Sequence, residues 1–285
     1  MSHKIQNILS GDTLTLSRCL ALEASTARLE VQCLLQKILL VPRVYLLAHP
    51  EHCLSVAQFT HYQTLIQRRL EGEPIAYILG EREFYGIKLK ITSATLIPRP
   101  DTELLVELAL QRITTLARCT VLDLGTGSGA IALAIAKMCP QADVVACDAS
   151  ASALAVAQEN AHKLGIQNVQ LLLSDWFAAL GAQRFTLIVS NPPYIAAGDV
   201  HLMQGDVRFE PLSALVSGVD GLDDIRHLIS HASSYLLPGG CLLLEHGYDQ
   251  AAKVRDLLHV AGFTEVFSAC DLAAIERVSG GVKCS

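Results

Sequence analysis

The sequence lacks the features of a membrane protein and of a broad nucleic-acid-binding surface. Its longest apolar stretch, residues 121–138, is interrupted by glycines and contains Asp123, whereas a membrane-spanning helix needs roughly 20 consecutive apolar residues. Lysine and arginine number 22 against 28 aspartates and glutamates, which gives a net charge of −6. We therefore expect no membrane association and no direct binding of nucleic acid through a basic face.

The cysteines lack the spacing of a metal site or of a disulfide framework. Nine are present, an odd number, and no two of them form a C-x-x-C pair. We therefore predict no metal, and we expect most cysteines to be small buried residues in a reducing compartment. Residues 1–5 contain no apolar stretch before a small-residue cleavage site, so no secretory signal is expected. Together these features predict a cytoplasmic protein.

What the sequence does contain begins with a helical region that has no glycine between Gly11 and Gly72. Residues 21–40 and 54–70 place apolar side chains mostly three or four positions apart, as amphipathic helices do. We predict a small all-α domain over residues 1–72. It is either a structural cap or a surface that grips a macromolecular partner, and the pattern does not separate the two.

Glycine and proline end the helical pattern after residue 72, and residues 84–91 then alternate as in a β-hairpin. We assign residues 73–95 to a linker with that hairpin and residues 96–285 to a second domain. Arg99 lies between two prolines just beyond the linker. Its guanidinium could be fixed over a ligand or could form a salt bridge with a neighbouring carboxylate.

The second domain alternates short apolar strands with helices. Strands are predicted at residues 120–124, 143–148, 169–173, 185–189, 241–245, 263–267 and 275–278. This alternation predicts an α/β fold with a doubly wound, mostly parallel sheet. The carboxyl ends of parallel strands share one edge of the sheet, so polar residues that follow the strands should gather there.

A glycine-rich turn follows the first of these strands. It consists of Gly125, Thr126, Gly127, Ser128 and Gly129. Glycines let the backbone turn tightly and approach a ligand closely. The spacing also fits the dinucleotide fingerprint, so the turn alone is compatible with an NAD-dependent oxidoreductase. The carboxylate of Asp123, two residues earlier, favours an amine-bearing ligand over a pyrophosphate.

Three more strand ends carry candidate ligand residues. Asp148 can bind the ribose hydroxyls of an adenosine ligand, and it can also cap the following helix. Trp176, the only tryptophan, can flank an adenine ring or pack in the core. Asn191 follows the fourth strand and begins the loop Asn191-Pro192-Pro193-Tyr194.

The loop at residues 191–194 is stiff and rich in hydrogen-bond acceptors. Pro192 and Pro193 have no N–H group and stop the strand, and Asn191 is held in an extended conformation before them. Such a loop suits a substrate with an NH2 group on a planar system. The alternative is an ordinary strand-ending turn with a surface tyrosine.

These motifs together resemble the class I S-adenosylmethionine-dependent methyltransferases, and more narrowly the PrmC/HemK family, which methylates a glutamine in peptide chain release factors. The resemblance rests on residues 96–103, 123–132, 191–195, 210–211 with 214–215, 245–247 and 277–278. It covers most of the chain from about Gly72 onward. The helical region before Gly72 is compatible with the family but carries no matching motif.

The resemblance implies a seven-stranded sheet, S-adenosylmethionine as cofactor, a release factor as protein substrate and a monomeric enzyme. Cofactor contacts would come from Gly125, Thr126, Gly127, Ser128, Gly129, Asp148, Trp176 and Asn191. The substrate glutamine would be held by Asn191, Pro192, Pro193 and Tyr194, of which Asn191, Pro192 and Tyr194 would serve catalysis. Phe84 and Arg99 would close the cofactor site.

Two other functions fit parts of the sequence. A DNA adenine methyltransferase would use the loop at residues 191–194 on a flipped base, although the acidic balance of the chain disfavours it. A non-catalytic binding module would keep the fold and dock a partner through the helical domain. The complete glycine-rich turn and the complete Asn-Pro-Pro-Tyr loop argue against such a loss of activity.

Overall fold

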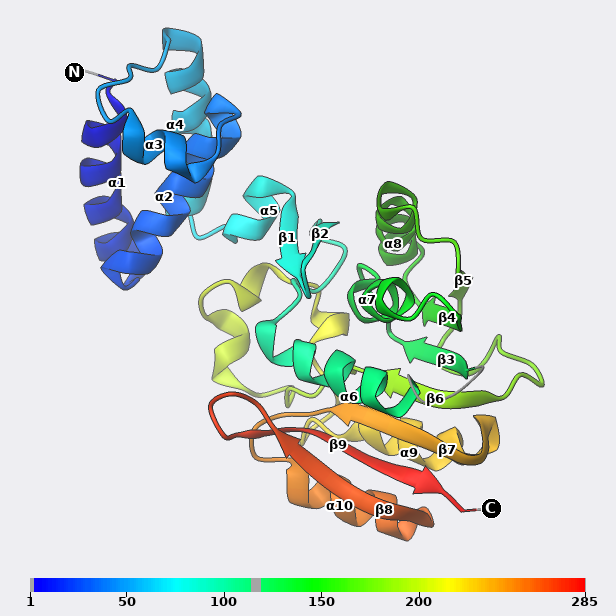
Figure 1. Cartoon of the computed structure of the whole chain (residues 1–285). Helices are drawn as coiled ribbons and strands as arrows, with labels where there is room; N and C mark the ends of the chain where they lie inside the picture. The colour runs from blue at the N-terminus through cyan, green and yellow to red at the C-terminus, as the bar shows by residue number, and fades with distance from the viewer. Residues whose placement is uncertain (1–2, 114–118, 285) are drawn as a thin grey trace. The chain divides into compact units, whose positions relative to one another are not determined.

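The computed structural model describes residues 3–113 and 119–284, which form two compact units (Figure 1). The first unit contains the residues up to Glu81 together with a later segment, Val200–Phe209. The second unit contains Arg82–Asp199 and the residues from Glu210 onward. No motif in the sequence separates residues 200–209 from the rest of the second domain, so their membership of the first unit is a finding of the structure.

The first unit is helical, which confirms the prediction of an all-α N-terminal region. Its helices are α1 (Ile5–Leu20), α2 (Ala24–Leu39), α3 (Arg43–Ala48), α4 (Val56–Leu70) and α5 (Ile75–Leu79). They bury a core that includes Leu16, Leu34, Leu46 and Tyr62. Helix α4 begins with a capping box, in which Ser55 and Gln58 satisfy each other's backbone N–H groups.

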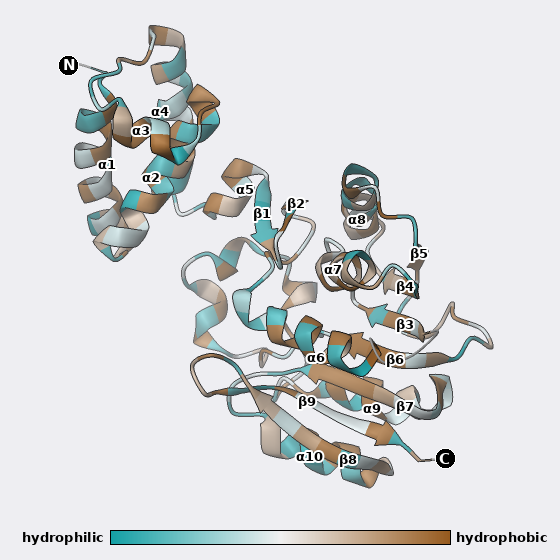
Figure 2. Cartoon of the chain, in the orientation of Figure 1, coloured by the Kyte–Doolittle hydropathy of each residue, from teal (hydrophilic) through white to brown (hydrophobic). Residues whose placement is uncertain are grey.

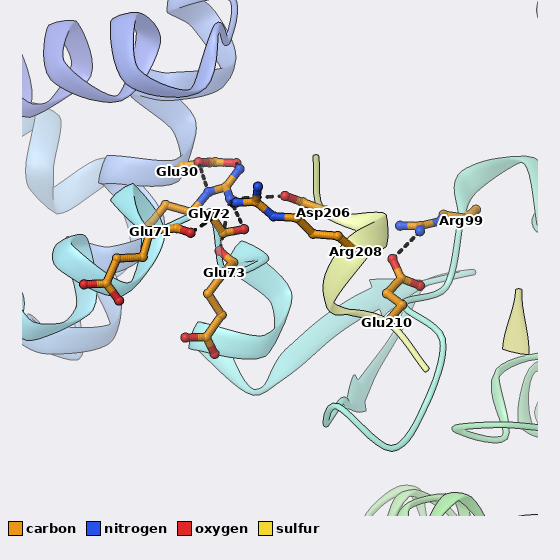
Figure 3. Close-up of polar contacts among 9 residues, drawn as sticks. Glu30, Glu71, Gly72, Glu73, Arg99, Asp206, Arg208 and Glu210 are labelled. Atoms are coloured by element: carbon orange, nitrogen blue, oxygen red, sulfur yellow. Dashed lines mark hydrogen bonds and ion pairs between the residues drawn. The ribbon is translucent and has the colours of Figure 1, made fainter. Parts of the chain in front are cut away.

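The segment Val200–Phe209 is tied to the helical unit by Arg69 of α4. The Arg69 guanidinium donates two hydrogen bonds to Glu30 of α2, at 2.8 and 3.2 Å, and one to Asp206 at 3.1 Å. Arg208 adds a hydrogen bond of 3.2 Å to the carbonyl of Glu71 (Figure 3). The segment thus contacts the C-terminal end of α4 through one ion pair and one hydrogen bond to a backbone carbonyl, and Glu30 of α2 holds the Arg69 side chain in place.

The second unit contains a seven-stranded sheet with the order β5-β4-β3-β6-β7-β9-β8. The strands are β3 (Cys119–Leu124), β4 (Ala142–Asp148), β5 (Val169–Leu173), β6 (Phe185–Ser190), β7 (Leu236–Glu245), β8 (Phe263–Cys270) and β9 (Glu276–Lys283). Neighbours from β5 to β7 pair in parallel, and β9 runs antiparallel to both β7 and β8. The predicted doubly wound, mostly parallel sheet is confirmed.

Helices cover the sheet because its strands are apolar on both faces. They are α6 (Glu103–Ile113), α7 (Ala130–Met138), α8 (Ala151–Leu164), α9 (Asp223–Tyr235) and α10 (Ala251–Val260). Leu122 and Ile188 pack in one cluster with Ile225 of α9 and Val254 of α10. Strand β7 is drawn largely in the brown of hydrophobic residues in Figure 2. Such near-continuous apolar runs are typical of parallel strands buried on both sides.

The shorter elements include the predicted hairpin and turns of 3₁₀ helix. The hairpin is formed by β1 (Glu81–Phe84) and β2 (Ile87–Lys90). The 3₁₀ turns are η1 (Pro100–Thr102), η2 (Val200–Met203), η3 (Val207–Phe209) and η4 (Leu212–Ala214). In the described part of the chain, no helix is long and apolar enough to cross a membrane.

The cysteines are more exposed than the sequence led us to expect. All nine are unpaired. Only Cys119, Cys139, Cys147 and Cys241 are buried, whereas four others are exposed and Cys33 is intermediate. The prediction that most cysteines are buried is therefore wrong. The buried four lie on or beside the central strands, where a small side chain fits between the sheet and its helices.

Candidate active site

A cavity of about 550 Å³ lies at the carboxyl edge of the parallel strands. It sits at the point where the strand order reverses, because β3 has β4 on one side and β6 on the other. Ligands of doubly wound sheets bind at such a switch point. Most of the predicted site residues line its walls: Gly125, Thr126, Gly127, Ser128, Asp148, Trp176, Asn191 and Pro193.

The glycine-rich turn is held open by positive backbone angles and by hydrogen bonds to the neighbouring strand. Gly125 and Gly129 have φ values of 73° and 85°, which side-chain-bearing residues rarely adopt. A Cβ atom on Gly129 would lie 2.9 Å from Leu133, so the close packing of the turn on α7 requires glycine there. The N–H groups of Gly125 and Thr126 both donate to the Cys147 carbonyl at 2.9 Å.

Asp123 has a structural task rather than the ligand contact that its charge led us to expect. Its carboxyl is completely buried and accepts hydrogen bonds from the Thr126 hydroxyl at 2.6 Å and the Ala132 N–H at 3.2 Å. It thus fixes the turn to the first residues of α7. Burial raises the pKa of Asp123 to about 7, with a smaller contribution from the nearby charge of Asp148.

Asp148 closes the glycine-rich turn from the end of β4. Its carboxylate accepts hydrogen bonds from the N–H groups of Gly127 and Ser150, each at 2.8 Å. The helix cap of α8 is made by Ser150, whose side chain accepts from the Ala153 N–H. Each carboxylate oxygen has a second lone pair, so Asp148 can also accept from ribose hydroxyls in the cavity that it lines.

Asp148→Asn is expected to raise the Kd for S-adenosylmethionine about 10- to 100-fold, because hydrogen bonds to a charged acceptor are worth roughly 1.5–3 kcal/mol. The amide NH2 would also face a backbone N–H of the turn. Calorimetric titration of the full chain measures this change. Asp256→Asn, on the exposed side of α10, is the matched control and should leave the Kd unchanged. An unchanged Kd in Asp148→Asn would contradict the ribose assignment.

Trp176 is the largest side chain in the cavity wall and has an unusual backbone. Its φ is 45°, and its carbonyl accepts a hydrogen bond from the Ser174 hydroxyl at 2.7 Å. Its ring approaches Gly125 so closely that a Cβ atom there would lie 3.4 Å from it. Strained backbone of this kind is common at ligand sites, where it aims a side chain. Here it places the indole against the glycine-rich turn.

The loop after β6 is positioned from three sides. The Ser190 hydroxyl donates to the Leu124 carbonyl at 2.7 Å, which joins the loop to the start of the glycine-rich turn. Asn191 donates through Nδ2 to the Thr102 hydroxyl oxygen at 3.2 Å. The Tyr194 carbonyl accepts from Gln250 at 3.0 Å, and a Cβ atom on Gly221 would lie 2.2 Å from that carbonyl oxygen. The loop backbone is therefore confined.

The other predicted residues do not line this cavity. Pro192 is buried, and Tyr194 is partly buried with its hydroxyl 3.3 Å from Glu245. Phe84 is fully buried and lines a separate cavity of about 270 Å³. Arg99 forms a salt bridge with the buried Glu210 (Figure 3), which is one of the two roles that its position between prolines allowed.

Some lining residues carry no motif in the sequence. Ser152 and Asp224 both line the cavity, from the first turns of α8 and α9. Their position in the first turn of a helix after a strand-ending loop is the one sequence signal that could have indicated them. Among residues 3–113 and 119–284, no group of three or more His, Cys, Asp or Glu side chains is arranged to hold a metal ion.

Two parts of the chain match known protein families. Residues 16–80 match the PrmC N-terminal domain, and residues 100–207 match the methyltransferase small domain. The first match covers the helices α2 to α5 and part of α1, for which the sequence motifs gave no family assignment. The second begins at the proline that follows Arg99 and includes the glycine-rich turn and the loop at residues 191–194.

Curated relatives match nearly the whole chain. A release factor glutamine methyltransferase of Bordetella pertussis is 52% identical over 94% of this chain and 99% of its own length. One of Escherichia coli is 47% identical over 91% and 94%, respectively. Among solved structures, the 16S rRNA N2 G1207 methyltransferase of Thermus thermophilus, in complex with AdoMet and guanosine, is 25% identical with a TM-score of 0.51. The match covers 71% of this chain and 49% of that one.

Proposed function

The chain belongs to the release factor glutamine methyltransferase family, and we propose that it methylates the side-chain amide nitrogen (N5) of the glutamine in the Gly-Gly-Gln motif of peptide chain release factors. The main observation that supports this proposal is that two loops line the same cavity. The glycine-rich turn after β3 and the Asn191 loop after β6 leave neighbouring strands and line the same cavity. A cofactor and a planar amide can therefore meet there.

The cavity fits S-adenosylmethionine in size and in its donors and acceptors. Its volume of about 550 Å³ lies within the range of small-molecule sites. Gly127 offers open space, because a Cβ atom built on it would meet no atom within 4 Å. Asp148 would hold the ribose, and Trp176 would lie beside the adenine. When bound, the cofactor supplies an activated methyl group on a sulfonium.

The protein's contribution to the reaction is to hold a poor nucleophile. The lone pair of an amide nitrogen is delocalised into its carbonyl, so the nitrogen needs positioning and charge stabilisation. The Asn191 side-chain oxygen and the Pro192 carbonyl would accept hydrogen bonds from the substrate NH2. They would align the nitrogen and stabilise the positive charge that develops on it during direct transfer. The proton would leave to water afterwards.

Tyr194 would exclude water from the substrate amide. Its ring follows the two prolines, and its hydroxyl is tied to the carboxyl of Glu245. Burial raises the pKa of Tyr194, so it stays protonated and donates that hydrogen bond throughout the physiological range. A ring fixed at one end in this way can stack on a planar amide without losing side-chain entropy when the substrate binds.

We further propose that the helical unit docks the release factor, that the enzyme acts as a monomer, and that it works in the cytoplasm. The family match over residues 16–80 supports a shared role for that unit. The net charge of −6 supports a protein substrate over duplex DNA, which attracts basic surfaces. The proposal thus covers the protein substrate, the oligomeric state and the compartment as well as the reaction.

Mass spectrometry of purified release factor after incubation with the enzyme and S-adenosylmethionine tests the proposed function. The expected result is a single added methyl on the glutamine of the Gly-Gly-Gln motif. A release factor with that glutamine replaced by alanine is the control and should gain no methyl. Methylation of DNA adenine with an unmodified release factor would overturn the proposal in favour of the DNA enzyme.

A further inference from the structure

A buried carboxyl group lies behind the Asn191 loop. Glu245 is the last residue of β7, and its side chain is completely enclosed. It accepts a hydrogen bond from the Tyr194 hydroxyl at 3.3 Å, and the nearby Thr102 hydroxyl also stabilises its charged form. Within the described residues its second oxygen, Oε2, has no hydrogen-bond partner. A buried carboxyl that is only partly satisfied is costly to keep, so it calls for an explanation other than stability.

Thr102 connects this carboxyl to Asn191. Thr102 is the last residue of η1 and is buried, and its hydroxyl oxygen accepts a hydrogen bond from Asn191 Nδ2 at 3.2 Å. A hydroxyl has only one proton to donate. When that proton is donated to Glu245, Thr102 can offer Asn191 only a lone pair. The NH2 end of the Asn191 amide must then face Thr102, and its oxygen must face the other way.

We propose that Glu245 is a positioning residue whose ionised carboxylate fixes the direction of the hydrogen-bond chain Asn191→Thr102→Glu245 and so presents the Asn191 oxygen to the substrate amide. This inference rests on the proposed function and names the residue that orients its acceptor. A neutral group at position 245 could donate to Thr102. The Thr102 hydroxyl could then donate to Asn191, whose amide would turn and present an NH2 group to the substrate NH2.

The same carboxylate also holds the other side of the substrate loop. The Tyr194 hydroxyl donates to Oε1 of Glu245, and the Thr102 hydroxyl stabilises the same carboxylate from η1. One buried group thus orients the amide at the start of the loop and the aromatic ring at its end. Loss of its charge should disturb both, while the cofactor contacts of Asp148 and the glycine-rich turn should stay intact.

The arrangement predicts a pH dependence. Burial raises the pKa of Glu245 to about 7, against the opposing effect of its hydrogen bonds from Thr102 and Tyr194. Of the charged groups nearby, Asp101 raises this pKa and Arg277 lowers it. Since the ionised form is the competent one, kcat should rise as the pH increases from about 6 to 8 and should level off above that range.

Glu245→Gln tests the inference, because it keeps the shape of the side chain and removes its charge. We expect kcat to fall about 10- to 100-fold, the Kd for S-adenosylmethionine to stay within about twofold, and the rise of kcat between pH 6 and 8 to disappear. Glu276→Gln, at a half-exposed site on β9, is the matched control and should keep the wild-type pH profile.

Thr102 supplies a second, independent readout. Thr102→Val removes the relay and should lower kcat as much as Glu245→Gln, whereas Thr102→Ser should restore most of that loss. The double variant Glu245→Gln with Thr102→Val should be no worse than either single variant, since both break one chain. A merely structural role would instead lower the Tm and leave the pH profile of kcat unchanged.

The wild-type enzyme, assayed in parallel, separates the two proposals. No methyl transfer to release factor by the wild type would overturn the proposed function. Transfer by the wild type together with full kcat and a retained pH rise in Glu245→Gln would overturn only the role of Glu245. Additive losses in the double variant would likewise show that Thr102 and Glu245 do not act as one chain.

Discussion

Asn191→Ala is expected to lower kcat for methyl transfer to release factor about 10²–10³-fold, the loss typical of removing one preorganised group that stabilises transition-state charge. The Kd for S-adenosylmethionine should change much less, within about fivefold, because the glycine-rich turn, Asp148 and Trp176 remain in the cavity wall. Radiolabelled methyl transfer and calorimetric titration measure the two effects separately.

Gln158→Ala provides the matched control for this prediction. Gln158 carries an exposed side-chain amide on α8, and alanine is well tolerated in a helix. Its kcat and Kd should equal those of the wild type. If Asn191→Ala kept more than about a third of the wild-type kcat, a loss below roughly 1 kcal/mol, Asn191 would not be the group that holds the substrate amide.

The sequence predicted the sheet well because its strands are short apolar runs separated by helices. The strand predicted at residues 169–173 is observed as β5, Val169–Leu173, and the others differ mostly at their ends. The helix boundaries near the N-terminus were harder to predict. A single helix was predicted over residues 21–40, whereas α2 spans Ala24–Leu39.

The end of α1 had no sequence signal because a non-glycine residue forms it, whereas the end predicted at residue 40 lies one residue beyond the observed end of α2. Ala21 and Leu40 have φ values of 52° and 55°, the left-handed conformation that usually marks a glycine after a helix. Neither residue type signals a helix end in a sequence. The capping box at Ser55 did carry such a signal, and α4 begins at Val56, close to the predicted start at residue 54.

The site was predictable in part for a topological reason. Parallel strands bring the residues after β3, β4, β5 and β6 to one edge, whatever their separation in sequence. Thr102 could not be placed in this way, because it precedes the sheet and reaches Asn191 only through packing. Glu245 belongs to the motif at residues 245–247 and is the acidic end of the apolar run at residues 241–244, which is fully buried in the fold, but nothing in the sequence connects it to Asn191.

Residues 200–209 belong to the helical unit because of long-range contacts, which cannot be recognised from the local sequence. Arg69 and Asp206 are 137 positions apart. Charged residues are also almost never fully buried unless they are paired, so an arginine in an amphipathic helix is expected on the solvent side. Arg69 is an exception, with 3% of its surface exposed.

Arg69→Ala is expected to destabilise the helical unit by about 3–5 kcal/mol, because it leaves the carboxylate of Glu30 buried without its partner. The carbonyls of Gly72 and Glu73 would lose a donor at 3.3 and 3.0 Å, and Asp206 would lose its anchor. Hydrogen exchange of the amides in α2 and α4 measures the change as a free energy of opening, unit by unit.

Arg68→Ala is the matched control, since Arg68 is the preceding residue and pairs with Glu73 at the surface, where such pairs contribute less than about 1 kcal/mol. The segment Val200–Phe209 should exchange faster in Arg69→Ala and normally in Arg68→Ala. Equal exchange rates in the two variants would show that Arg69 does not anchor the segment.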